Sequence, residues 1–179
     1  MRETFSMKIA GLDRELKKFP VNEKLDIAAF ILFGDVEVTI AAAKELLKIV
    51  PDFDYILTPE AKSIPLAYEM SRQSGKPYIV ARKGVKVYMD NPVSVSVKSI
   101  TTNNEQKLFI GSDDAEIMNG KRVLIVDDVI STGESLAAIQ ALANTAGANT
   151  VASCAVLAEG DAADRDDIIF LHKLPLFFK

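Results

Sequence analysis

The segment 123–135, which reads VLIVDDVISTGES, constrains the fold more than any other part of the sequence. Its four leading apolar residues predict a buried strand, which is followed by two adjacent acids, a turn of small and hydroxyl-bearing residues, and a helical pattern. In open α/β sheets, ligands bind outside the carboxyl ends of the strands, so this order of features predicts a binding site. We expect Asp127 and Asp128 at the end of the strand, and the backbone N–H groups of the turn suit a phosphate.

The turn offers three hydroxyl groups and one glycine. Gly133 lets the backbone approach a ligand closely, whereas Ser131, Thr132 and Ser135 can donate hydrogen bonds. The two acids would repel a phosphate, so we expect them to bind the vicinal hydroxyls of a ribose, because carboxylates accept hydrogen bonds. A purely structural role, in which Asp128 or Thr132 caps the helix, would explain one polar residue but not the whole run.

The rest of the chain repeats a pattern of short apolar strand, polar turn and helix. Strands are predicted at 54–58, 77–81, 122–126 and 151–157. Helices are predicted at about 36–50, 65–75 and 134–146. Strands that alternate with helices predict an α/β fold with an open, mainly parallel sheet. The first helix carries one apolar stripe, made of Val36, Ile40, Ala43, Leu47 and Val50.

Two segments interrupt this alternation. Residues 5–9 alternate between apolar and polar side chains, which is typical of a strand or hairpin packed beside the core. Residues 83–112 contain alternating valines, a polar stretch and a second apolar run, which predict a long hairpin projecting from the sheet as a lid. Because no linker or repeat is visible, we predict one domain over 1–179, with a core at about 36–158 and an accessory part at about 1–35 and 160–179.

Composition and charge exclude several classes of function. A net charge of −4 and a pI of about 5.1 make nucleic acid an unfavourable partner. The apolar runs are too short to cross a bilayer, and the N-terminal segment has charges where a signal peptide needs an apolar region. One cysteine and one histidine allow neither an intrachain disulfide nor a cysteine or histidine metal cluster. We therefore expect a soluble cytoplasmic protein without membrane association.

Segment 123–135 resembles the motif with which type I phosphoribosyltransferases bind 5-phosphoribosyl 1-pyrophosphate (PRPP): apolar residues, two acids, two further residues, a small residue, Thr-Gly, a variable position and Ser or Thr. A second stretch, TPEAKSIPLAYEMSRQSGKPYIVARK at 58–83, is similar to the earlier half of adenine phosphoribosyltransferases and related purine enzymes. The resemblance implies a type I phosphoribosyltransferase-like fold with a small hood over the site. It also implies a homodimer, and a Mg²⁺ cofactor held mainly by PRPP rather than directly by the protein.

The resemblance assigns roles residue by residue. The catalytic pair is Asp127 and Asp128. The 5′-phosphate loop is Ser131, Thr132, Gly133, Glu134 and Ser135. The pyrophosphate is bound by Glu60, Ala61, Lys62, Ser63, Arg82 and Lys83. The flexible loop contains Lys86, Ser99, Thr101 and Thr102.

The implied activity is transfer of phosphoribosyl from PRPP to a purine base, with adenine favoured, in purine salvage. Two departures from the adenine enzymes leave alternatives open. Lys62-Ser63 stands where those enzymes carry Arg-Gly, and the loop at 99–102 lacks their catalytic acid. Residues 81–103 look closer to xanthine phosphoribosyltransferases and bacterial purine repressors, so the alternatives are a 6-oxopurine enzyme or a PRPP-sensing regulator without catalysis. The regulator is disfavoured because the first 50 or so residues lack a helix-turn-helix pattern.

Overall fold

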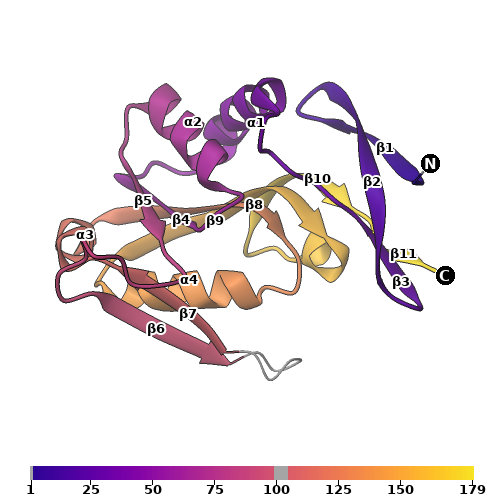
Figure 1. Ribbon diagram of the computed structural model, residues 1–179. Helices are drawn as coiled ribbons and strands as arrows, with labels where there is room; N and C mark the ends of the chain where they lie inside the picture. Colours follow the sequence, from indigo (N-terminus) through magenta and orange to yellow (C-terminus); the bar gives the residue numbers. More distant parts are fainter. Residues whose placement is uncertain (1, 99–104) are drawn as a thin grey trace.

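A central sheet of five parallel strands organises the computed structural model, which describes residues 2–98 and 105–179 (Figure 1). The strands lie in the order β10-β9-β8-β4-β5. Their bounds are Tyr55–Pro59 for β4, Tyr78–Ala81 for β5, Arg122–Ile130 for β8, Asn149–Glu159 for β9 and Ile169–Leu174 for β10. The sheet confirms the predicted α/β fold with mainly parallel pairing.

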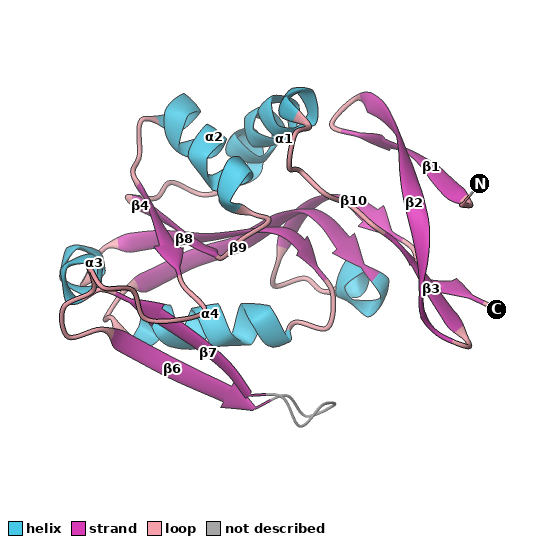
Figure 2. Ribbon diagram, viewed as in Figure 1, coloured by secondary structure: helices cyan, strands magenta, loops and turns pink. Residues whose placement is uncertain are grey.

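Helices cover both faces of this sheet, which explains why its strands are apolar on both sides (Figure 2). Helices α1 (Val36–Ile49) and α2 (Ile64–Ser74) pack on one face, and α4 (Glu134–Thr145) packs on the other. The alternation along β8 divides the core accordingly: Leu124 and Val126 join the cluster of α1 and α2, whereas Val123 and Ile125 join that of α4. Two short helices complete the set, α3 (Ser112–Met118) and the 3₁₀ turn η1 (Gly160–Asp164).

The apolar stripe of α1 faces the core only in part. Ala43 is buried, and Leu47 and Val50 pack against the core cluster, whereas Val36 and Ile40 are 68% and 43% exposed. The buried residues of the helix are Val38, Thr39, Ala42, Ala43 and Leu46. Apolar residues occupy most of the circumference of this helix, so periodicity alone could not choose between neighbouring stripes. Its start is set locally, because the Asp35 carboxylate accepts a hydrogen bond from the backbone N–H of Val38 at 3.2 Å.

Strand β8 runs further than predicted, and this changes the position of the two acids. The strand continues to Ile130 because its pairing with β9 continues, with Asp127 opposite Ala155 and Val129 opposite Leu157. Asp127 and Asp128 therefore lie inside the paired part of strand β8, near its carboxyl end, rather than after the strand. Their backbone is held by the neighbouring strand, so their direction is fixed by the sheet.

A second, antiparallel sheet stands beside the β10 edge of the first and contains both chain ends (Figure 1). We call it the hood; its strands are β1 (Thr4–Ile9), β2 (Leu12–Asn22), β3 (Leu25–Ala28) and β11 (Phe177–Phe178). Polar contacts of Arg14 and His172 join it to the rest of the chain, and Arg14 Nη2 also lies 2.9 Å from Glu37 Oε2 at the start of α1. Arg14 on β2 binds the Asp35 carboxylate through two nitrogens at 2.7 and 2.9 Å. The His172 Nε2 atom on β10 accepts the backbone N–H of Ala10 at 2.9 Å.

The predicted hairpin is present as β6 (Val93–Lys98) paired with β7 (Glu105–Ile110). It does not stand free of the core, because Leu108 and Ile110 are buried with α4 and β7 bridges to Arg82 through Phe109. The predicted lid residues Ser99, Thr101 and Thr102 lie outside the described residues. Among the residues that the structure does describe, no helix is long and apolar enough to cross a membrane.

Candidate functional site

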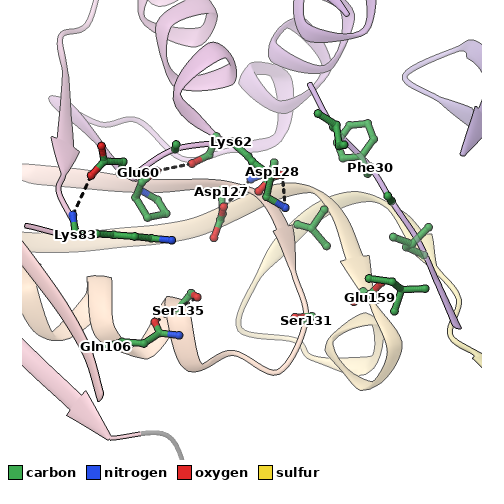
Figure 3. Close-up of a pocket in the computed structure, with 18 of the residues that line it drawn as sticks. Phe30, Glu60, Lys62, Lys83, Gln106, Asp127, Asp128, Ser131, Ser135 and Glu159 are labelled. Atoms are coloured by element: carbon green, nitrogen blue, oxygen red, sulfur yellow. Dashed lines mark hydrogen bonds and ion pairs between the residues drawn. The ribbon is translucent and has the colours of Figure 1, made fainter. Parts of the chain in front are cut away.

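The site lies where the connectivity of the central sheet reverses. From β4 the chain continues to β5 on one side, whereas from β8 it continues through β9 and β10 on the other. The connections that follow β4 and β8 therefore diverge and leave a crevice at the carboxyl ends of these two neighbouring strands. A cavity of about 590 Å³ occupies this crevice and extends beneath the hood (Figure 3).

Most of the residues predicted for the site line this cavity. Those that do are Glu60, Ala61, Lys62, Ser63, Lys83, Asp127, Asp128, Ser131 and Ser135. Those described residues that do not are Thr132, Gly133 and Glu134, which continue the turn between two lining residues, together with Arg82 and Lys86. The predicted ribose, phosphate and pyrophosphate segments thus meet at one cavity, while Lys86 lies away from its walls.

The two aspartates are buried against each other. The Asp128 backbone N–H donates to Asp127 Oδ1 at 2.8 Å. Asp128 is 4% exposed, and its Oδ2 atom is buried without a hydrogen bond from any described residue; Lys62 Nζ lies 3.4 Å from it (Figure 3). Burial raises the pKa of Asp127, and the adjacent Asp128 charge raises it further. The pair can therefore accept hydrogen bonds from hydroxyl groups of a ligand and would be stabilised by positive charge.

The turn after β4 is fixed to β8 by buried hydroxyl groups. The Ser63 hydroxyl donates to the Pro59 carbonyl at 2.9 Å, and Thr58 Oγ1 lies 2.8 Å from both Ser63 Oγ and the carbonyl oxygen of Val126. In the interior, these hydroxyl groups provide the hydrogen bonds that the carbonyl oxygens of Pro59 and Val126 would otherwise make to water. The turn that carries Lys62 is therefore held at a fixed position relative to the aspartates on β8.

A second polar contact joins this turn to the end of β5. Glu60 accepts the backbone N–H of Lys83 at 3.0 Å, and its other oxygen lies 3.3 Å from Arg82 Nη2. The Lys83 N–H and then the Arg82 charge hold the pKa of Glu60 below its usual range. Glu60 is thus an ionised anchor that holds the Lys83 backbone and pairs with the Arg82 guanidinium, rather than itself a group suited to bind an anion.

The start of α4 is open to a ligand. Gly133 occupies the N-cap with φ +83°, a left-handed conformation that favours glycine, and has no side chain to cap the first turn; the Glu134 N–H has only a long contact of 3.5 Å to Thr132 Oγ1. The Arg165 guanidinium lies against it, since a Cβ atom on Gly133 would come within 2.5 Å of Nη1. Sequence reasoning missed Arg165, because it follows the 3₁₀ turn η1, which no motif marks.

The far end of the cavity was also missed. Its walls come from residues 27–31, which end β3 and follow it and which we call the hood segment, and from Val129, Glu159 and Leu174. Near the start of α4, Gln106 of β7 also lines the cavity, with its Oε1 atom 3.5 Å from Ser135 Oγ. One signal could have found Glu159: it lies two residues after the strand predicted at 151–157 and ends the observed β9, and parallel strands end at the same edge of a sheet. The hood segment carries no comparable pattern.

A family model described as "Phosphoribosyl transferase domain" matches residues 37–174, most of the chain. The chain belongs to the phosphoribosyltransferase domain family. A "Hypoxanthine/guanine phosphoribosyltransferase" of Methanococcus voltae is 30% identical over 162 residues, which cover 86% of this chain and 83% of the relative. "HGPRTase-like protein 1" of Halalkalicoccus jeotgali is 34% identical, covering 84% of this chain and 77% of that protein. The predicted family is therefore confirmed.

Solved structures of the same fold carry a different name. The adenine phosphoribosyltransferase of Thermoanaerobacter pseudethanolicus superposes with a TM-score of 0.74 at 21% identity, covering 88% of this chain and 95% of that one. The yeast enzyme from Saccharomyces cerevisiae, solved with adenine and an iminoaltritol bisphosphate, gives a TM-score of 0.68 at 23% identity, covering 87% and 92%. At this identity they confirm the type I phosphoribosyltransferase fold.

Proposed function

We propose that this phosphoribosyltransferase transfers the phosphoribosyl group of PRPP to a purine base, giving a nucleoside 5′-monophosphate and pyrophosphate. The observation that carries the proposal is the buried Asp128 Oδ2 atom, which accepts no hydrogen bond from the described residues and faces a cavity. Lys62 Nζ lies 3.4 Å from this oxygen and partly balances its charge, but a buried carboxylate oxygen without a hydrogen bond is costly, so it suits a ligand that brings a donor. A ribose hydroxyl is such a donor.

The surrounding groups suit the other parts of PRPP. The uncapped start of α4 offers backbone N–H groups and the positive end of a helix dipole to the 5′-phosphate, with Ser131 and Ser135 adding hydroxyl donors. Lys62 and Lys83 line the opposite side of the cavity, where they can neutralise the pyrophosphate. PRPP would thus span the crevice with its ribose over Asp127 and Asp128.

The charged side chains of the cavity favour cleavage of the bond between the ribose and the pyrophosphate. The bond between C1 of the ribose and the pyrophosphate oxygen breaks, its electron pair leaves with pyrophosphate, and positive charge develops at C1. Asp127 and Asp128 stabilise that charge, while Lys62 and Lys83 stabilise the leaving group. A ring nitrogen of the purine then bonds to C1, and its N–H proton passes to the released pyrophosphate or to solvent.

Magnesium fits this arrangement as a cofactor carried mainly by the substrate. The described residues hold no group of three or more Asp, Glu, His or Cys side chains that could bind a metal ion. Mg²⁺ commonly keeps several waters and binds through one or two carboxylates together with substrate phosphates, so Asp127 and Asp128 could supply its protein contacts. When bound, the ion would neutralise charge on the pyrophosphate.

The acceptor is proposed to be a 6-oxopurine, with adenine as the second candidate. Relatives at 30% and 34% identity bear hypoxanthine and guanine names, and these matches extend over most of both chains. The adenine preference drawn from the sequence has support from fold neighbours at only 21% and 23% identity. A PRPP-sensing regulator would bind PRPP through the same groups without turnover.

Incubation of the protein with PRPP, Mg²⁺ and each purine or pyrimidine base in turn tests the proposal. Nucleotide and pyrophosphate should form in equal amounts with at least one purine. If PRPP binds but none of the bases reacts, the regulator replaces the enzyme. If PRPP does not bind, the assignment of the crevice is wrong.

A further inference from the structure

The end of the cavity beneath the hood has the chemistry of a base pocket with one selecting group. Its walls are apolar, with Ile27 and Phe30 from the hood and Val129 and Leu174 from the sheet. Figure 3 places Glu159 on the same side of the cavity as the segment that carries Phe30, across the aspartates from Glu60 and Lys83. Apolar walls suit the faces of a planar ring system, and a single polar group fixes its orientation.

Glu159 is held there by the sheet. It is the last residue of β9 and pairs with Leu174 of β10, so its backbone belongs to the same edge of the sheet as Asp127 and Asp128. A ring that bonds to C1 of a ribose over the aspartates would therefore point its opposite edge toward Glu159. In a purine this is the edge that differs between adenine, hypoxanthine and guanine.

The Glu159 carboxyl group has no hydrogen bond or ion pair with any described residue, although it is half-buried in the cavity wall. Lys62 forms its ion pair with Asp128, whose Oδ2 atom is 3.4 Å from Lys62 Nζ, and not with Glu159. Burial raises the pKa of Glu159, whereas the Lys62 charge lowers it. A half-buried acid without a protein partner suits a ligand that supplies donors.

A carboxylate and an amide at this position would select different bases. An ionised carboxylate only accepts hydrogen bonds, so it matches two adjacent N–H donors. Guanine presents such a pair in its N1–H and 2-amino groups, hypoxanthine presents N1–H alone, and adenine presents a donor beside an acceptor. An amide, which both donates and accepts, matches adenine in the way that Asn and Gln do in DNA recognition.

We propose that Glu159 is the residue that selects the base, by accepting hydrogen bonds from N1–H and the 2-amino group of a guanine-type 6-oxopurine. The inference rests on the proposed function, because it places the base relative to PRPP. It adds a specificity residue outside the segments that resemble the PRPP motif. It also commits to guanine over hypoxanthine and adenine.

The test compares the wild-type protein with Glu159→Gln and with Asp161→Asn, a matched change at an exposed acid two residues further along. For each protein, kcat/KM is measured with guanine, hypoxanthine and adenine, and the Kd of GMP and AMP is measured by calorimetry. Wild-type protein should prefer guanine, and Glu159→Gln should shift the guanine-to-adenine ratio toward adenine by roughly 5- to 150-fold, the range of one bidentate base contact. Asp161→Asn should leave the ratio unchanged.

A structural role for Glu159 would lower all activities together and leave the ratio constant, which overturns the inference. A wild-type preference for adenine also overturns it. The binding measurements separate this result from failure of the proposed function. If no base reacts but GMP binds better than AMP and Glu159→Gln reverses that order, the transferase proposal fails while Glu159 remains the selecting residue. If neither nucleotide binds, both proposals are wrong.

Discussion

The two ends of the cavity are built in different ways. At the PRPP end, the groups come from strand ends and turns of the central sheet, and hydroxyl groups of Thr58 and Ser63 fix the turn after β4 to β8. At the hood end, the wall is the segment 27–31, most of which follows the last residue of β3 in irregular conformation. Under the proposed function, the strand ends and turns at one end of the cavity would carry out the chemistry on PRPP, whereas the hood segment and Glu159 at the other end would set the choice of base.

The sharpest test of this division is Asp128→Ala, which should remove turnover at the PRPP end. Loss of a group that stabilises transition-state charge should lower kcat by at least about 100- to 1000-fold. Because Asp128 carries no described hydrogen bond through Oδ2, circular dichroism and the melting temperature should show a folded protein. Asp166→Asn, at an exposed acid, is the control and should retain activity. Full activity in Asp128→Ala would sink the assignment of the crevice.

The same division explains what the sequence could predict. The PRPP end is encoded by contiguous segments, 58–63 and 123–135, so strand, turn and helix patterns locate its residues before any tertiary contact is known. The hood end joins residues 27–31, Glu159 and Leu174, which are far apart in sequence and share no local pattern. Arg165 was missed for the same reason.

The errors inside predicted elements also have a physical cause. The length of β8 depends on its pairing with β9, which a single segment does not reveal. The buried face of α1 depends on which of several apolar stripes meets the sheet. Local patterns therefore predicted four of the five strands of the central sheet and its three longer helices, whereas β10, α3 and the ends and faces of the elements required the tertiary contacts.

At the hood end, Phe30→Ala should affect base binding more than PRPP binding. Phe30 is 5% exposed, belongs to the core and lines the cavity, so the change should also lower the free energy of unfolding by about 3–5 kcal/mol. Initial rates should show a KM for the base raised at least tenfold with a nearly unchanged KM for PRPP. The control is Phe33→Ala, since Phe33 is 56% exposed and should tolerate the change. Equal increases in both KM values would contradict the separation of the two ends.

A smaller effect is expected from Gly133→Ala at the start of α4. Gly133 and Gly34 both have φ +83°, so alanine at either position should cost about 1–2 kcal/mol of stability. Only Gly133 has a neighbour, Arg165, that the new Cβ atom would displace; nothing lies within 4 Å at Gly34. Calorimetry should therefore show PRPP affinity reduced roughly tenfold in Gly133→Ala alone, about the loss of one hydrogen bond to a charged group. Similar affinities in the two variants would show that this glycine does not approach the phosphate.

The smallest predicted effect concerns the contact between hood and sheet through His172. Burial lowers the pKa of His172, so the folded state takes up a proton less readily than the unfolded state. Its contribution to stability is therefore present above the unfolded pKa of about 6.5 and is lost as the pH falls below it. Protonation of Nε2 also removes the acceptor for the Ala10 N–H, a loss of about 1 kcal/mol.

Melting temperatures between pH 7.5 and 5.5 should fall more steeply for the wild type than for His172→Gln, because this is the one histidine in the chain. Over the same range, the KM for the base should rise more than the KM for PRPP, because protonation weakens the hood contact and leaves the β4 and β8 turns in place.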